Sequence, residues 1–81
     1  MPKRPRPALV RWVDACDAAT EWSAVDKVAA SRPVDCESVG FLLAQDDERV
    51  VLTTSLSDDG DAAAGIVIPT SCVSEVLFLD A

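Results

Sequence analysis

The sequence contains no histidine and no tyrosine, and its 81 residues include only four aromatic side chains and three glycines. Without histidine, general acid–base catalysis at neutral pH would depend on a carboxylate or a lysine. The three glycines, Gly40, Gly60 and Gly65, are too far apart to form the glycine-rich loop that holds phosphates in common nucleotide-binding motifs. These absences argue against an enzyme, so we expect no catalytic residue and no cofactor.

Cysteine is also scarce, and the three present, Cys16, Cys36 and Cys72, form no C-x-x-C pair. An odd number of scattered cysteines does not make a disulfide framework, and zinc prefers four cysteine or histidine ligands. We therefore expect no metal site and three small, buried thiols in a reducing compartment. An intermolecular disulfide or metal site is the alternative.

The acidic cluster Asp58, Asp59 and Asp61 is superficially similar to a calcium-binding loop. An EF-hand loop requires a glycine at position 6 and a glutamate at position 12. Counted from Asp58, these positions hold Ala63 and Pro69. The cluster is therefore predicted to be a solvated turn.

No apolar run approaches the roughly 20 residues of a membrane-spanning helix. Residues 1–7 carry positive charge and three prolines, and only three apolar residues follow before Arg11, which is too few for the apolar centre of a secretory signal. Proline fixes φ and removes a hydrogen-bond donor. We expect residues 1–7 to form a flexible basic arm and residues 8–81 a single domain in the cytoplasm.

The charge is distributed unevenly along the chain. Residues 1–11 contain four basic and no acidic residues, whereas residues 12–81 contain three basic and fourteen acidic residues, which gives +4 and −11. A body with this charge repels phosphate backbones, so a nucleic-acid partner is unlikely on electrostatic grounds. It would attract a basic protein surface, although acidic side chains also serve solubility alone.

The second half of the chain consists of short apolar runs separated by polar turns, a pattern typical of a small antiparallel barrel or sandwich. Gly40 predicts a bend or bulge in a long second strand. In the third strand Leu52 and Thr54 should face the core and Thr53 the wetter side. The expected strands are residues 8–14, 34–44, 50–56, 65–69 and 73–79.

One short helix is predicted over residues 23–30. Ser23 is a good N-cap with Asp26 at the capping-box spacing, and Val25, Val28 and Ala29 form a narrow apolar stripe. Because two helical turns are not stable alone, we expect this helix to pack on the sheet, with Trp22 fixing it there.

Residues 69–72 suit a single helical turn because proline is favoured at the first helical position. Five strands with one helical turn before the last resemble the SH3-like and Sm-like small barrels. The resemblance implies a mainly β, five-stranded antiparallel barrel, with the helix of residues 23–30 inserted between the first two strands.

A second resemblance concerns residues 10–15, 39–43, 50–52 and 68–69. They are similar to segments of small uncharacterised proteins encoded by bacteriophages and prophages. The similarity is carried by apolar and turn residues, so it implies a shared core and no shared site residues. It implies a phage accessory protein in the cytoplasm of a bacterial host.

Taken together, these features predict a non-enzymatic protein that binds a host or phage protein through an acidic barrel surface, and that is a possible homo-oligomer. Tryptophan side chains can anchor a partner, although both could instead belong to the core. The candidate contact residues are Trp12, Trp22, Arg11, Asp58, Asp59 and Asp61.

Two other functions fit the sequence. An oligomeric Sm-like ring could sequester a small nucleotide if its cationic residues converge; these are Arg11, Lys27, Arg32 and Arg49. An acidic mimic of nucleic acid would need carboxylates aligned on one surface; these are Asp35, Glu37, Asp46, Asp47, Asp58, Asp59 and Asp61.

Overall fold

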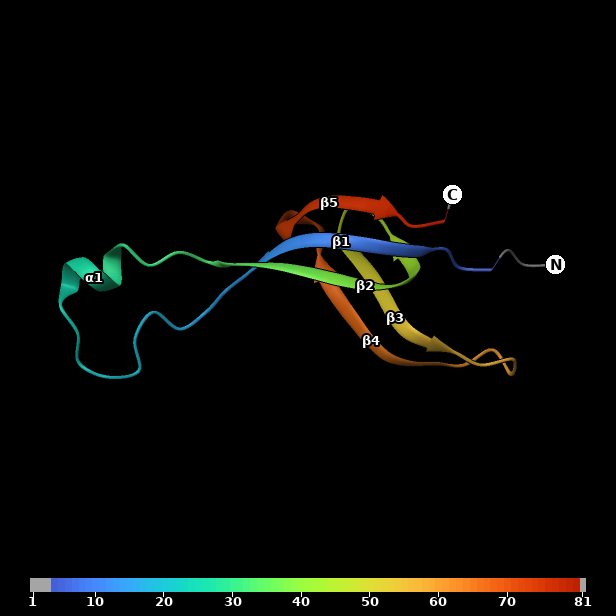
Figure 1. The fold of residues 1–81 in the computed structure, drawn as a ribbon, viewed down its shortest axis with the longest axis horizontal. Coiled ribbons are helices and arrows are strands. Elements are labelled where there is room, and N and C mark those ends of the chain that lie inside the picture. The colour runs from blue at the N-terminus through green and yellow to red at the C-terminus, as the bar shows by residue number, and fades with distance from the viewer. Residues whose placement is uncertain (1–3, 81) are drawn as a thin grey trace.

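The computed structural model describes residues 4–80, which form one five-stranded antiparallel sheet (Figure 1). The strand order across the sheet is β4-β3-β2-β1-β5. The elements in chain order are β1 (Pro7–Asp14), α1 (Val25–Ala29), β2 (Val34–Gln45), β3 (Arg49–Leu56), β4 (Ala62–Pro69), the 3-10 helix η1 (Thr70–Cys72) and β5 (Val73–Phe78). The prediction of five antiparallel strands with a short helix between the first two is confirmed.

The sheet is open within residues 4–80, because its edge strands β4 and β5 do not pair with each other. It nevertheless encloses one core. Val10 of β1, Leu52 of β3 and Ile68 of β4 are at most 2% exposed, and Val50 is buried beside them. Val76 of β5 packs against the same cluster, so the strands at both edges of the curved sheet contribute to one apolar interior.

The irregularity in β2 lies two residues beyond the predicted position. The pairing of β2 with β3 shifts register between Leu42 and Ala44, so the bulge is not at Gly40. Gly40 serves close packing instead: a Cβ there would lie 2.7 Å from the carbonyl oxygen of Thr53. The sequence marked Gly40 as a special position, but the bulge predicted there lies further along β2, and close packing on Thr53 is what requires glycine.

The predicted alternation of β3 is wrong at its C-terminal end. Thr53 is buried, and its hydroxyl donates a hydrogen bond of 2.6 Å to the carbonyl oxygen of Ala63, whereas Thr54 is exposed. On the neighbouring strand Ala64 has a positive φ of 58°. The β3–β4 pairing passes from Thr53↔Gly65 to Ser55↔Ala63 around this residue. The departure from strict alternation in β3 therefore lies opposite the irregular backbone of Ala64, in a strand β4 that begins at Ala62 and not at residue 65.

The turn between β2 and β3 is organised by Asp46. Its Oδ1 accepts hydrogen bonds from the backbone N–H groups of Glu48 and Arg49, at 2.9 and 3.0 Å, and its Oδ2 accepts one of 2.7 Å from the Arg49 side chain. The backbone hydrogen bond from Glu48 is the largest cause of a lowered pKa at Asp46, followed by that from Arg49. The turn therefore prefers the ionised carboxylate.

This lowered pKa predicts a contribution of Asp46 to acid sensitivity. The Asp46 carboxylate has a lower pKa folded than unfolded, so it stabilises the fold above about pH 4 and this stabilisation is lost as the pH falls through the folded value. Urea unfolding at pH 6 and pH 3 should show a smaller loss of stability for Asp46→Asn than for the wild type. Asp47→Asn is the control, because Asp47 makes no side-chain hydrogen bond within residues 4–80. This variant should lose as much stability between pH 6 and pH 3 as the wild type does.

The predicted helical turn before the last strand is confirmed as η1, with Pro69 as its N-cap. Thr70 ties it to the β2–β3 turn, through a 2.7 Å hydrogen bond from its hydroxyl to the carbonyl oxygen of Asp46 and a 3.1 Å bond from its N–H to that of Glu48. These bonds fix where β5 begins.

The predicted packing of the inserted helix is wrong. α1 begins at Val25 and buries no residue, its N-cap is Ala24 without a side-chain hydrogen bond, and the Ser23 hydroxyl donates to the carbonyl oxygen of Glu21 instead. Figure 1 shows α1 far from the sheet, in a molecule whose extents are 58 × 22 × 22 Å. Two valines and an alanine offer too little apolar area to hold the insertion against the sheet.

Residues 6–7 and 79–80 lie side by side at the end of the sheet opposite to α1 (Figure 1). Arg6 donates two hydrogen bonds of 2.9 Å to the Asp80 carboxylate, and the N–H of Leu79 donates to the carbonyl oxygen of Pro7 at 2.9 Å. Of the predicted basic arm, Arg6 and Pro7 are thus attached to the sheet, while residues 1–3 lie outside the described residues. Among residues 4–80 no helix has the length and hydrophobicity to cross a membrane.

Candidate interaction surfaces

The most exposed apolar side chains lie in the insertion between β1 and β2, residues 15–33, which we call the projecting arm. The Trp22 side chain is fully exposed, Val25 is 84% exposed and Val28 is 38% exposed. At the base of the arm the Cys16 thiol donates a 3.4 Å hydrogen bond to the carbonyl oxygen of Arg32. Exposure of both faces of an indole ring to water is unfavourable, because tryptophan has the largest apolar surface of any side chain. Such exposure indicates a surface that a partner covers.

Three acidic residues share the projecting arm with Trp22. Glu21 precedes Trp22 directly, Asp17 lies five residues before it, and Asp26 is in the first turn of α1. None of these three carboxylates is in an ion pair within residues 4–80. The projecting arm therefore combines an exposed aromatic side chain with three unpaired carboxylates and two cations, Lys27 and Arg32, which gives it a net charge of −1.

Trp12, the other candidate tryptophan, belongs to the fold. It is half-buried against the core cluster, and its indole N–H donates a 3.0 Å hydrogen bond to the Ser38 hydroxyl. Buried tryptophan usually satisfies its N–H in this way. The prediction that both tryptophans could be core residues holds for Trp12 and is wrong for Trp22.

Arg11 lies on the outer face of the sheet between two glutamates. Its guanidinium donates hydrogen bonds to Glu37 at 2.9 Å and to Glu75 at 3.0 Å, on the neighbouring strands β2 and β5. The Glu37 hydrogen bond is the largest cause of a pKa for Arg11 above its ordinary value. A guanidinium that is already paired twice is poorly suited to bind a new anion.

Asp58, Asp59 and Asp61 lie in the turn between β3 and β4. Gly60 there has a φ of 90°, and the Ser57 hydroxyl accepts a hydrogen bond from the N–H of Asp61 at 3.1 Å. Figure 1 places this turn at the end of the molecule away from α1. The six predicted contact residues therefore do not form one site; they occupy the arm, the core, the outer sheet face and a distant turn.

A groove that sequence reasoning missed lies beside the chain ends. It has a volume of about 350 Å³ and is lined by Arg4, Pro5, Arg6, Leu42, Leu43 and Phe78. We call it the N-terminal groove. The guanidinium of Arg6 stacks on the Phe78 ring, 3.8 Å from its centroid, and its hydrogen bonds to Asp80 lower the pKa of that carboxyl group. The only signal in the sequence is the basic segment itself, which predicts a flexible arm and not a groove.

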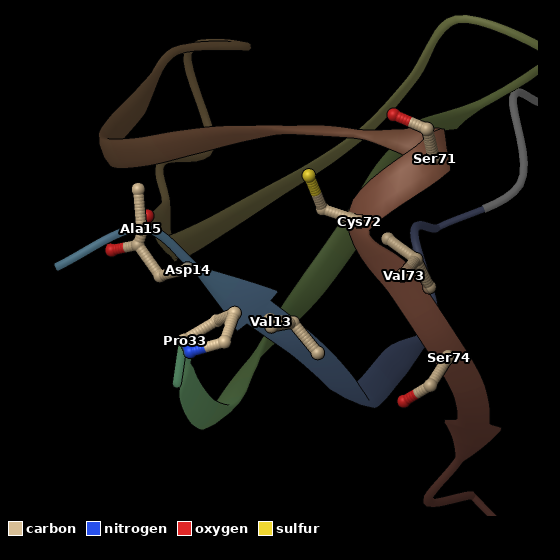
Figure 2. Close-up of a pocket in the computed structure, with 8 residues that line it drawn as sticks. All are labelled: Val13, Asp14, Ala15, Pro33, Ser71, Cys72, Val73 and Ser74. Carbon is tan, nitrogen blue, oxygen red and sulfur yellow. The ribbon is translucent and has the colours of Figure 1, made fainter. Parts of the chain in front are cut away.

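A second groove, of about 430 Å³, lies at the base of the projecting arm (Figure 2). Its lining comes from the end of β1, from Pro33 and from the η1–β5 segment, and includes Val13, Asp14 and Cys72. The polar groups are a carboxylate, a thiol and the hydroxyls of Ser71 and Ser74, with no cationic side chain in the lining. Such a groove offers no positive charge to a phosphate.

The residues needed for the other two functions are also dispersed. Arg49 pairs with Asp46 in the β2–β3 turn, and Arg11 pairs with two glutamates of the sheet. Lys27 and Arg32 lie in the projecting arm. The four cations therefore do not converge within one chain. The acidic turns that join β2 to β3 and β3 to β4 lie at opposite ends of the eight-residue strand β3. This separates their carboxylates by about 25 Å.

Within residues 4–80 no three cysteine, aspartate or glutamate side chains lie close enough together to hold a metal ion. A comparison with known protein families, curated proteins and solved structures finds no match for the chain.

Proposed function

We propose that this protein is a non-enzymatic, phage-type accessory protein that binds a host or viral protein in the bacterial cytoplasm, and that the projecting arm is its principal contact. The observation that carries this proposal is the fully exposed Trp22 on a segment in which no residue is buried. Tryptophan is enriched among the few residues that dominate binding energy at protein interfaces. The phage and bacterial context is proposed only from the sequence resemblance described for residues 10–15 and 39–43.

The charge of the molecule indicates the chemistry of the partner. Of the fourteen acidic residues only four are in ion pairs within residues 4–80: Glu37, Asp46, Glu75 and Asp80. The remaining carboxylates attract a basic surface over long range and orient its approach. The partner should therefore present an apolar groove bordered by lysine or arginine.

The scaffold in this proposal is an SH3-like or Sm-like small barrel. The strand order β4-β3-β2-β1-β5 and the position of η1 directly before β5 support it. In such a scaffold the loop between the first two strands is free to vary in length without disturbing the core. This is where the chain inserts the projecting arm.

Substitution of Trp22 tests the proposal. Affinity capture from bacterial lysate would use the wild-type chain, Trp22→Ala and the control Val67→Ala, which truncates a 64% exposed apolar side chain on β4. A partner captured by the wild type and by Val67→Ala should be lost with Trp22→Ala. With the purified partner, the dissociation constant should rise about 30-fold, the effect of losing a central aromatic anchor. Equal binding by Trp22→Ala would refute the role of the arm.

A ring that sequesters a small nucleotide is the second candidate. One observation favours it: both edge strands, β4 and β5, are left unpaired by the sheet order and could pair with further copies. The dispersed cations weigh against it, because a phosphate would need donors from several copies at once.

A further inference from the structure

The chain carries, at its opposite end, a surface with the chemistry that the projecting arm requires of a partner. Building on the proposed function, we propose that the arm of one copy docks through Trp22 into the N-terminal groove of a second copy. The two copies then associate head to tail.

The N-terminal groove has the composition expected of a receptor for an acidic, aromatic segment. Its base is formed by Leu42, Leu43 and Phe78, and both Leu43 and Phe78 are 43% exposed. Its volume is about 350 Å³ and it is open to solvent along one side, so an indole ring could lie in it as in a surface groove. The register shift of β2 between Leu42 and Ala44 falls at Leu43, one of the exposed apolar residues of the lining.

Each of the two surfaces carries an unpaired charge, and the two charges have opposite signs. Arg4 borders the groove and makes no ion pair within residues 4–80, whereas the second cation of the lining, Arg6, is paired with Asp80. Glu21 lies directly beside Trp22 on the arm. Because each copy has a net charge of −7, copies repel one another in most orientations. An orientation that brings Glu21 of one copy to Arg4 of the other offsets part of this repulsion.

The arrangement of the two surfaces makes the contact intermolecular. Figure 1 shows α1 at one end of the long axis and the N-terminal segment at the other, with β1 running between them. The eight residues of β1 separate the base of the arm from the groove by about 25 Å, and the arm points away from it. A contact between two different surfaces is heterologous, so it closes into a ring or continues as a chain.

Two variants that each destroy one surface test the proposal in solution. By light scattering after size exclusion, the wild type should exceed the 8.6 kDa of one chain, whereas Trp22→Ala and Leu43→Asp alone should each be monomers. Mixed in equal amounts, they should form a 1:1 pair of about twice that mass, since one copy supplies an intact groove and the other an intact arm. Circular dichroism confirms that both variants are folded.

Charge reversal adds a second measurement. Arg4→Glu should weaken association about tenfold, and combining it with Glu21→Arg should restore most of the loss, since opposite charges again face each other. Val67→Lys is the matched control: a lysine on the edge strand β4 discourages strand pairing but leaves arm and groove intact. The double variant is expected to fold like the wild type, because both positions are exposed.

Three results of these experiments would contradict head-to-tail docking. A wild type that stays at 8.6 kDa at high micromolar concentration overturns it, while capture of a different protein through Trp22 would leave the proposed function intact. Assembly that survives Trp22→Ala but is lost with Val67→Lys would show that strand edges, and not the arm, join the copies. Two monomeric variants that fail to pair when mixed would also refute it.

Discussion

Gly40→Ala should destabilise the protein severely although it adds a single methyl group. The new Cβ would lie 2.7 Å from the carbonyl oxygen of Thr53 and 3.3 Å from its carbonyl carbon, and both atoms belong to the backbone of β3. A backbone in the middle of a sheet cannot rotate away as a side chain can. Overpacking of this kind costs about 1–3 kcal/mol, and here two paired strands must separate locally. A domain of this size has only about 4–12 kcal/mol of stability to lose.

Gly65→Ala provides the matched control for this prediction. A Cβ at Gly65 would meet only the carbonyl oxygen of Leu52, at 3.6 Å, which is an ordinary contact. Urea unfolding should therefore show a large decrease in midpoint for Gly40→Ala and little change for Gly65→Ala. Equal effects of the two substitutions would mean that loss of glycine flexibility, and not close packing on Thr53, determines the cost.

The strands and the helical turn could be predicted because their signals are local. Short apolar runs bounded by polar turns located all five strands to within about three residues, and Pro69 marked η1. The errors arose where the outcome depends on distant parts of the chain. The bulge after Leu42 and the positive φ of Ala64 adjust one strand to its neighbours, and no residue pattern within β2 or β4 encodes them.

The site was harder to predict for the same reason. A tryptophan directly before a helix predicts packing of both on the sheet. The helix α1 has only five residues and a narrow apolar stripe, which is too small to hold the helix against the sheet. The N-terminal groove unites residues 4–6, 42–43 and 78, and its key ion pair joins Arg6 to Asp80 across 74 positions. Only the pairing of β1 with both β2 and β5 brings these segments together.

Leu52→Ala should produce the second large loss of stability. Leu52 is 2% exposed and lies in the cluster that joins β1, β3 and β4. Truncating a buried leucine costs about 2–5 kcal/mol, because the lost transfer energy is increased by the cavity that remains. Leu77→Ala removes the same atoms from a side chain that is 40% exposed on β5, and should cost much less. Thermal and urea unfolding of both variants would measure the difference, and equal losses would disprove the assigned core.

Placing the core in the sheet alone also predicts how Trp22→Ala behaves in the same experiment. Trp22 is the larger side chain, but it contacts no buried residue, so its removal should leave the unfolding midpoint unchanged while Leu52→Ala lowers it. If Trp22→Ala unfolded early, the projecting arm would have to pack on the sheet in solution, and lost binding by that variant would no longer identify a contact. An unchanged midpoint makes the two roles separable: the sheet supplies the stability, and the arm supplies the surface for a partner.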